Sequence, residues 1–355
     1  MARTATTKSL SSETQPRSQV IGDGANPQRH LTLQPGSVVD HRFRIIRELG
    51  RGGMATIYEV VDVLRSTQHA LKVAHHAPGA WAALNREALV LSRLQHANVV
   101  NVCSLALRAE DSLFYTNNSL VNNVDGGCEQ TIRYIVLELL PGQTLRDYLH
   151  SHGPLRLERM RPFIWSLIDQ VTAALIYLHD RNVLHLDINP ANLIFHAADK
   201  RVVVIDFGLA QSLGGIGNRA YVTPGYGSPE QLFGYGLDQR ADVFGLAATL
   251  YEAFTGRPPY DRATIQAGAQ AVLGQLPPHW PAALSPELGQ ILQRALAPQR
   301  ESRPKNIATI RAELAKVVCL STTVPTGKSA SRTTWPSYFH RRLRGASLPE
   351  GKEHG

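Results

Sequence analysis

Two short polar segments in the middle of the chain carry side chains that could do chemistry. The first runs from His185 to Asn192 and contains Asp187, and the second begins at Asp206 with the sequence Asp-Phe-Gly. Asp187 could accept a proton, while the oxygens of Asn192 and Asp206 are hard ligands of the kind that Mg²⁺ prefers. A proton acceptor beside two metal ligands is the equipment of phosphoryl transfer, so this reaction is the first hypothesis.

The composition fits one catalytic unit with tails. The chain has 355 residues, of which 43% are hydrophobic, and this length can bury a large core. Its cysteines, Cys103, Cys128 and Cys319, lie far apart and form no Cys-x-x-Cys pair. The sequence therefore predicts neither a disulfide framework nor a zinc site, and it favours a reducing, cytoplasmic location. No apolar run approaches the roughly 18 residues of a membrane span, so we expect a soluble protein.

Both ends of the chain have compositions typical of disordered segments. Residues 1–40 are rich in Ser, Thr, Gln, Pro and Gly, and residues 319–355 are polar with a basic patch at 340–344. We expect one folded domain over 41–318 between these two disordered tails. Much of the formal net charge of +8 lies in the tails and around 156–161. No aromatic residues alternate with the basic ones, so we interpret the charge as a solvated surface and expect no dedicated nucleic-acid site.

A glycine-rich turn between two strand-like runs follows the first tail. The runs cover 43–49 and 56–61. Glycine lets backbone N–H groups approach phosphate oxygens closely, because no side chain stands between them. The turn could therefore cover a nucleotide, although a purely structural hairpin would have the same pattern. Its residues are Gly50, Arg51, Gly52, Gly53, Met54 and Ala55.

A lysine in the next strand needs a partner. Lys72 lies in the apolar run 69–74, where an unpaired ammonium group would be costly. Glu87 follows in the segment 85–94, whose apolar spacing predicts a helix. The alternative is an ordinary strand lysine and a solvated glutamate on a helix surface.

The order and spacing of these motifs resemble the eukaryotic-like serine/threonine protein kinase family. The resemblance covers residues 41–318 and implies an α+β fold of two lobes. The N-lobe and hinge, 41–141, would be a small antiparallel β-sheet with one helix, and the C-lobe, 142–318, would be mainly helical. A helix expected over 161–179 would deliver the catalytic loop. The implied reaction transfers the γ-phosphoryl group of ATP to serine or threonine hydroxyls of a protein, with Mg²⁺ or alternatively Mn²⁺.

The resemblance also implies roles for individual residues. Asp187 would accept the hydroxyl proton, with Asn189, Lys72 and Glu87 completing the catalytic set. Lys72, paired with Glu87, would hold the α- and β-phosphates of ATP. The metal ligands implied by the resemblance are Asn192 and Asp206.

A buried strand over 134–142 resembles the strand and hinge between the lobes, and the polar run 110–130 before it is expected to be a long loop. Leu137 would be the gatekeeper residue, and the main chain of Glu138 and Leu140 would hold adenine. Further nucleotide-binding residues implied by the resemblance are Ile57, Ala70, Lys72 and Ile194.

The segment 206–230 resembles an activation segment. Its end, from Thr223 to Glu230, favours serine/threonine over tyrosine specificity. Glu230 is expected to pair with Arg303, and Asp242, in a buried helix, is expected to accept hydrogen bonds from the backbone of the catalytic loop. The counterpart of Thr223 in the family hydrogen-bonds the catalytic aspartate.

Five positions depart from the family pattern, and two of them, Val222 and Ser228, replace a glycine and an alanine at the end of the activation segment. Ala55 replaces the third glycine of the turn, and Leu186 replaces the arginine that binds a phosphorylated activation segment. Asn189 replaces a lysine that contacts the γ-phosphate. Losing this cation would cost about 3 kcal/mol, on the order of a hundredfold in rate. Asn189 could still donate a hydrogen bond, so we expect an active but slow enzyme that Asn189→Lys would accelerate.

Two alternatives follow from the missing lysine. One is a pseudokinase, a nucleotide-binding or scaffolding module without catalysis. The retained set of catalytic and metal-binding residues argues against it. The other is a small-molecule phosphotransferase, which shares the catalytic loop and lacks that lysine. Ser228, Glu230 and Arg303 argue against it, because they serve a segment that binds peptides.

The activation segment offers little for phosphorylation to act on. Between Asp206 and Thr223 its only hydroxyl side chains are Ser212 and Tyr221, and Leu186 removes the arginine that would bind a phosphate. We therefore expect activity that does not depend on phosphorylation of this segment. Control would come from the tails or from a regulatory partner.

Overall fold

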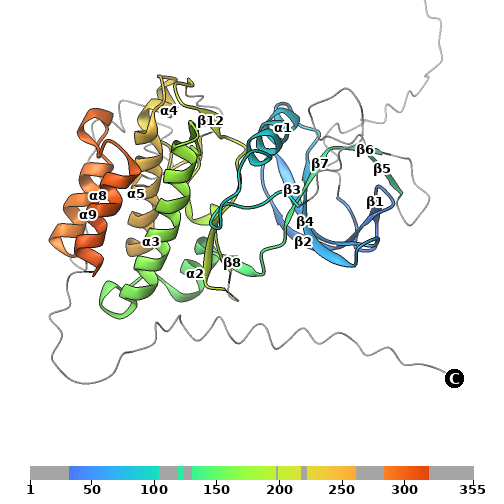
Figure 1. Ribbon diagram of the computed structural model, residues 1–355, viewed down its shortest axis with the longest axis horizontal. Coiled ribbons are helices and arrows are strands. Elements are labelled where there is room, and N and C mark those ends of the chain that lie inside the picture. The colour runs from blue at the N-terminus through green and yellow to red at the C-terminus, as the bar shows by residue number, and fades with distance from the viewer. Residues whose placement is uncertain are drawn as a thin grey trace, which may run out of the picture. The chain divides into compact units, whose positions relative to one another are not determined.

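The computed structural model describes residues 32–103, 119–122, 130–196, 199–216, 222–260 and 284–319. The expected tails, apart from residues 32–40 and 319, lie outside the described residues. Among the described residues, no helix is long and apolar enough to cross a bilayer. The large sheet lies in the first part of the chain, and most of the helices lie in the second part of the chain (Figure 1).

A seven-stranded antiparallel sheet forms the first part of the domain, with strand order β6-β5-β1-β2-β3-β4-β7. Helix α1 (Ala80–Leu91) packs against β4 and β7, as Figure 1 shows. Residues 70–74 of β4 are all buried, as expected for a strand that is covered on both faces. The strands are β1 (Val38–Val39), β2 (Phe43–Arg51), β3 (Ala55–Asp62), β4 (Thr67–Ala74), β5 (Ser119–Asn122), β6 (Gln130–Ile132) and β7 (Tyr134–Glu138).

Two parts of this sheet differ from the sequence-based expectation. The tail was expected to end at residue 40, but Leu33 is buried and its N–H donates to the Tyr58 hydroxyl at 3.1 Å. Strand β1 then pairs with both β2 and β5, so the packed domain begins before residue 41. The run 110–130 was expected to be a loop, but β5 lies within it and pairs with β6. Backbone hydrogen bonds form these strands, and they need no apolar pattern in the sequence.

Helices dominate the second part of the domain. Helix α3 (Leu157–His179) is kinked at Met160, whose φ is −125° and which lies two residues before Pro162. The uninterrupted part of the helix therefore begins at residue 161, as expected. Helices α3, α5, α8 and α9 pack beside one another (Figure 1). The helices are α2 (Leu145–His152), α3 (Leu157–His179), α4 (Pro229–Phe233), α5 (Gln239–Thr255), α8 (Pro286–Ala295) and α9 (Ile307–Cys319), with 3₁₀ helices η1 (Pro190–Asn192) and η3 (Arg300–Ser302).

Two small sheets carry the catalytic loop and its neighbours. Strand β10 (Leu193–His196) pairs with β11 (Arg201–Val204) and β8 (Gly142–Thr144). Strand β9 (Val183–Leu184) pairs with β12 (Gln211–Ser212). The catalytic loop therefore runs from β9 to η1 and β10, while the segment that begins at Asp206 follows β11.

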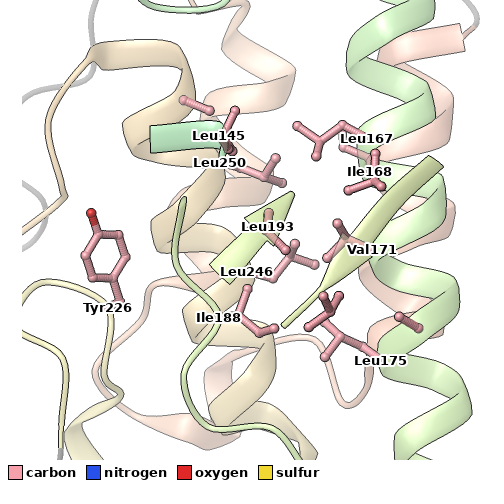
Figure 2. Packing of buried hydrophobic residues seen from close by; sticks show 14 of the residues in the cluster. Leu145, Leu167, Ile168, Val171, Leu175, Ile188, Leu193, Tyr226, Leu246 and Leu250 are labelled. Atoms are coloured by element: carbon pink, nitrogen blue, oxygen red, sulfur yellow. The ribbon is translucent and has the colours of Figure 1, made fainter. Parts of the chain in front are cut away.

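The core of the helical part lies between α3, α5 and β10. Figure 2 shows Leu246 of α5 facing Val171 and Leu175 of α3, with Ile188 and Leu193 beside Leu246 in the same cluster. Helix α5 is buried over 13 of its 17 residues, so it is a central helix with almost no exposed face. Because Ile188 packs into this core, the catalytic loop rests on a rigid support.

Candidate active site

Helix α5 holds the backbone of the catalytic loop through one carboxylate. Asp242, which is 1% exposed, accepts hydrogen bonds from the backbone N–H of His185 at 2.9 Å and of Leu186 at 2.7 Å. His179 of α3 also contacts this carboxylate at 2.7 Å. Burial alone would raise the pKa of Asp242, but these contacts lower it, so the group is charged. The expected contact between Asp242 and the loop is present.

The Asp187 carboxylate is surrounded by donors. Its Oδ1 accepts from the Thr223 hydroxyl at 2.6 Å and from Asn189 Nδ2 at 3.0 Å, and its Oδ2 accepts from Asn192 Nδ2 at 2.8 Å. Burial raises the pKa of Asp187 to about 7 although these hydrogen bonds oppose the shift, and the charge of Asp206 adds to it. A fixed carboxylate with a pKa near neutrality is suited to accept a proton from a substrate hydroxyl.

Asn189 is used differently from the hydrogen bond to phosphate that we expected. Its Nδ2 donates to the Asp187 carbonyl at 3.1 Å as well as to the carboxylate, and its Oδ1 accepts from Ala191 N–H at 2.9 Å. The residue is 3% exposed and caps helix η1. Both ends of the amide are therefore used within the loop, where they hold Asp187 in place.

Lys72 forms the expected ion pair and a second one. Its Nζ lies 2.6 Å from Glu87 Oε2 and 2.8 Å from Asp206 Oδ1. Burial alone would lower the pKa of Lys72, but the two carboxylates outweigh it and raise the pKa. The ammonium group is therefore charged, and it joins strand β4 and helix α1 to the Asp-Phe-Gly segment.

Helix α1 contacts this segment at two further points. Glu87 Oε1 accepts from Phe207 N–H at 3.3 Å, and Arg86 Nη1 donates to the Gly208 carbonyl at 2.9 Å. Sequence analysis assigned no role to Arg86, because nothing in a helix pattern reveals contact with a segment more than a hundred residues away. Its position next to Glu87 in the sequence was the only indication that Arg86 lies near the site.

Asn192 and Asp206 meet the requirements of a magnesium site. The main chain joins them, because Ile205 N–H donates to the Asn192 carbonyl at 3.0 Å. Asn192 donates through Nδ2 to both the carbonyl and the carboxylate of Asp187, so its Oδ1 is the atom that remains for a cation. The Asp206 side chain is 43% exposed and can offer a second oxygen. This donor set fits a hard divalent cation.

The glycine-rich turn joins β2 to β3. Gly52 N–H donates to the Ala55 carbonyl at 2.9 Å and closes the turn. A Cβ atom added at Gly50 or Gly53 would meet no protein atom within 4 Å, and none of the three glycines has a positive φ. Folding alone therefore does not require glycine at these positions. This finding favours close approach by a ligand over a purely structural hairpin.

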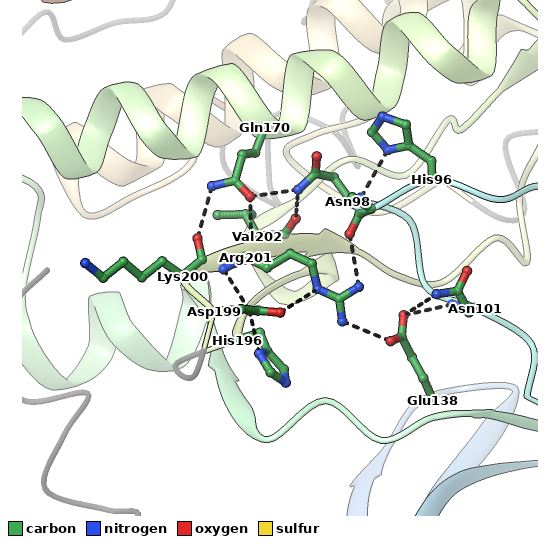
Figure 3. A network of polar contacts seen from close by, with 11 residues as sticks. His96, Asn98, Asn101, Glu138, Gln170, His196, Asp199, Lys200, Arg201 and Val202 are labelled. Carbon is green, nitrogen blue, oxygen red and sulfur yellow. Dashed lines mark hydrogen bonds and ion pairs between the residues drawn. The ribbon is translucent and has the colours of Figure 1, made fainter. Parts of the chain in front are cut away.

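The hinge strand β7 turns the Glu138 side chain into a polar network (Figure 3). Its Oε1 accepts from Asn101 N–H at 2.9 Å, and its Oε2 lies 2.9 Å from Arg201 Nη2 of β11. Arg201 Nη1 also donates to the Ala97 carbonyl at 3.1 Å. The side chain is thus occupied in supporting the hinge, and only the main chain of Glu138 is a candidate for contact with adenine.

The other expected nucleotide-binding residues lie on neighbouring strands. Ala70 of β4 is paired with Leu137 of β7, and Ile57 of β3 is paired with Lys72. Ile194 lies on β10, in the helical part of the domain. Ala70 and Ile57 belong to one sheet and Ile194 to another. A nucleotide bound between the two sheets would be what brings these residues into one site.

The end of the activation segment is fixed by a buried ion pair. Arg303 contacts both oxygens of Glu230, at 2.7 and 2.9 Å, as expected. Gln231 of α4 donates to the Leu186 carbonyl at 2.8 Å and so ties this segment to the catalytic loop. Ser212, in β12, is exposed, and Tyr221 lies outside the described residues.

Leu186 belongs to a small apolar cluster. It packs with Leu184, Leu237 and Ala241, and Leu209 of the activation segment covers them. Leu186 has a φ of 66°, a left-handed conformation that is costly for a residue with a branched side chain and marks a fixed backbone. An apolar contact therefore stands where the family has a phosphate-binding arginine.

Comparisons with known proteins agree with this geometry. A family model described as protein kinase domain matches residues 43–314. Serine/threonine-protein kinase PknB of Mycolicibacterium smegmatis is 30% identical over 289 residues, which cover 78% of this chain and 43% of that protein. PknB of Mycobacterium tuberculosis (strain H37Rv) is 30% identical over 300 residues, covering 79% and 44%. A probable PknB of Lactococcus lactis is 28% identical, covering 82% and 44%. The chain thus spans less than half the length of these relatives.

Proposed function

Because the chain belongs to the protein kinase family and has its two-lobed α+β fold, as predicted, we propose that it transfers the γ-phosphoryl group of ATP to serine or threonine hydroxyls of a protein. The observation that carries this proposal is the fixed Asp187 carboxylate beside Asn192, with Lys72 joining Glu87 to Asp206. These contacts support the proposal, in which Asp187 would be the proton acceptor, Lys72 the phosphate-binding cation, and Asn192 and Asp206 the metal ligands. The serine/threonine relatives at 30% identity support the acceptor class.

In this proposal the chain's own residues position the reactants. Asp187 accepts the proton of the attacking hydroxyl at its carboxylate, and Thr223 and Asn189 hold that carboxylate in place. Lys72 binds the α- and β-phosphates while Glu87 orients it. Asn192 and Asp206 would hold Mg²⁺ or Mn²⁺, which when bound neutralises charge on the phosphates. The main chain of Glu138 and Leu140 would receive adenine.

A protein substrate is favoured over a small alcohol. The Arg303–Glu230 bridge and the Gln231–Leu186 contact hold the end of the activation segment against the catalytic loop. Thr223, in the same segment, contacts Asp187 directly. An activation segment held by these contacts offers a surface on which a peptide can bind. A small substrate does not require such a surface.

A pseudokinase is the second candidate. One observation favours it: the Asn189 amide is used within the loop, so it supplies neither a cation nor a free donor to the transferred phosphate. The complete set of Lys72, Glu87, Asp187 and Asp206 contacts favours catalysis.

A labelling assay separates these functions. Purified protein is incubated with ATP labelled at the γ-phosphate, with Mg²⁺ or with a chelator, and with either a basic protein or a mixture of small alcohols as acceptor. We expect metal-dependent label on serine and threonine of the protein acceptor. Label on the alcohols alone would assign a small-molecule phosphotransferase, and nucleotide binding without any transfer would assign a pseudokinase.

Location and regulation are part of the same proposal. Cys103 and Cys319 are free thiols, which supports a reducing, cytoplasmic environment. The apolar cluster around Leu186 supports control from outside the activation segment, through the tails or a partner protein.

A further inference from the structure

One histidine makes three contacts to the glycine-rich turn. His75 follows strand β4 and is buried, with 6% of its surface exposed. Its backbone N–H donates to the Met54 carbonyl at 2.8 Å, its Nδ1 lies 3.2 Å from the Gly53 carbonyl, and its Nε2 lies 2.8 Å from the Thr56 hydroxyl. A carbonyl only accepts, so Nδ1 carries a hydrogen, and the Thr56 hydroxyl, which can donate or accept, is the partner of Nε2.

These contacts fix the direction of two peptide groups. The carbonyls of Gly53 and Met54 both face His75. In a planar trans peptide the following N–H points the opposite way from the carbonyl, so the amides of Met54 and Ala55 face away from His75. Neighbouring glycines at 52 and 53 would otherwise give this turn wide conformational freedom. The His75 side chain therefore fixes the peptide between Gly53 and Met54, and its main chain fixes the peptide between Met54 and Ala55.

The contact acts on the turn and adds little to the sheet. The pairing of β3 with β4 ends at Ala55 and Ala74, so the Gly53 carbonyl lies beyond the last paired residues. The full ladder between these strands is formed without it. A residue that held only the strands together would have no reason to contact Gly53.

We propose that His75 is a positioning residue for nucleotide binding, which presets the Met54 and Ala55 amides toward the phosphates of ATP. This inference rests on the proposed function, because it assumes that the turn covers a nucleotide. Preorganised donors bind an anion without the cost of ordering a flexible glycine loop at the moment of binding. The same three contacts would be made before the nucleotide arrives.

The chain contains a matched control for this contact. Thr67 and His69, on strand β4, form a pair of the same chemistry, with Thr67 Oγ1 also 2.8 Å from His69 Nε2. This pair lies at the far end of β4 from the turn and contacts none of its residues. Variants of the two pairs remove the same type of bond, and they differ in their connection to the turn and in burial, since the Thr56–His75 pair is buried and the Thr67–His69 pair is exposed.

The test compares His75→Phe, His75→Asn and Thr56→Val with His69→Phe and Thr67→Val. Hydrogen exchange of residues 50–57 is measured in the nucleotide-free protein, and affinity is measured with a fluorescent ATP analogue. We expect His75→Phe to speed exchange in the turn and to weaken nucleotide binding about fivefold, as for the loss of one or two hydrogen bonds. KM for ATP should rise by the same factor with kcat nearly unchanged. His75→Asn, which keeps a donor near Gly53, should recover part of the loss.

Equal exchange in wild type and His75→Phe, or the same change in the His69 and Thr67 variants, would overturn the inference. Thr56→Val removes the hydroxyl but keeps the shape of the side chain, so it decides the question if His75→Phe does not fold. A wild-type protein that binds no ATP analogue would overturn the proposed function instead. The exchange comparison would then still show whether His75 fixes the turn.

Discussion

Within the described part of the chain, two ion pairs between a basic residue and a glutamate are buried, and they differ in how fully the cation is hydrogen-bonded. Arg303 has five N–H groups, and all five have acceptors: both oxygens of Glu230 and the carbonyls of Arg240, Ala297 and Pro298. Lys72 contacts Glu87 and Asp206. Its third ammonium hydrogen has no acceptor among the described residues. A saturated cation can only hold the fold, whereas an unsaturated one beside a partly exposed carboxylate can bind a ligand.

The comparison predicts the largest loss of stability for Arg303→Met. Removing one partner of a fully buried pair leaves Glu230 charged without a donor, which costs about 3 to 5 kcal/mol. We expect the melting temperature to fall by about 10 °C in thermal denaturation. Glu230→Gln, whose amide oxygen still accepts one hydrogen bond from the guanidinium group, is the matched control and should cost less. A melting temperature within 2 °C of wild type for Arg303→Met would refute the structural role.

We expect Lys72→Met to lower turnover more than it lowers stability. Burial already raises the pKa of Glu87, so this carboxyl can take up a proton when its cation is lost, and Asp206 is partly exposed. We expect a smaller fall in melting temperature than for Arg303→Met. Turnover should fall on the order of a hundredfold, because a preorganised charge at the phosphates is lost. Turnover in the labelling assay and the melting temperature are measured for both variants. Equal losses of turnover and of melting temperature in Arg303→Met and Lys72→Met would contradict the comparison.

Asn189 tests the positioning of Asp187. Asn189→Ala removes the hydrogen bonds to Asp187 and the cap of η1, and we expect turnover to fall about tenfold while nucleotide affinity stays the same. Turnover of Asn189→Lys should be higher than that of Asn189→Ala, because an ammonium group can reach Asp187 and adds the cation that the site lacks. Steady-state kinetics of the two variants checks both statements, and an alanine variant as fast as wild type would remove Asn189 from the site.

The same site shows which features a sequence can reveal. Lys72, Glu87, Asp187, Asn192 and Asp206 were predicted as site residues from their order along the chain, and the expected pair of Lys72 with Glu87 is present. The use of the Asn189 amide was not predictable, because residue type does not specify which of several nearby acceptors and donors a short side chain selects.

Elements held by backbone or by distant contacts were missed for related reasons. Strands β1 and β5 lie in runs whose composition predicts a tail and a loop, because backbone pairing needs no apolar alternation. Arg86 and His75 contact segments that only the folded chain brings near. The family fold was predictable because the order and spacing of short motifs indicated the family, whereas contacts between polar side chains of distant segments were not predictable.

The smallest expected effect concerns phosphorylation. Leu186 packs under Leu209 in an apolar cluster, so the first part of the activation segment is held without a phosphate. Treatment of the purified protein with phosphatase should change the initial rate by less than about twofold, well below the tenfold that corresponds to about 1.4 kcal/mol. A tenfold fall that autophosphorylation at Ser212 reverses would show that a charge-based switch operates.

Asp187→Asn, compared with wild type for γ-phosphate transfer and for ATP binding, tests the central claim most directly. The change keeps the size of the side chain and removes its capacity to accept a proton. We predict that turnover falls at least about a hundredfold, as expected when a general base is lost, while ATP affinity stays within about twofold. A variant that labels the protein substrate as fast as wild type would contradict the assignment of Asp187 and, with it, the proposed mechanism.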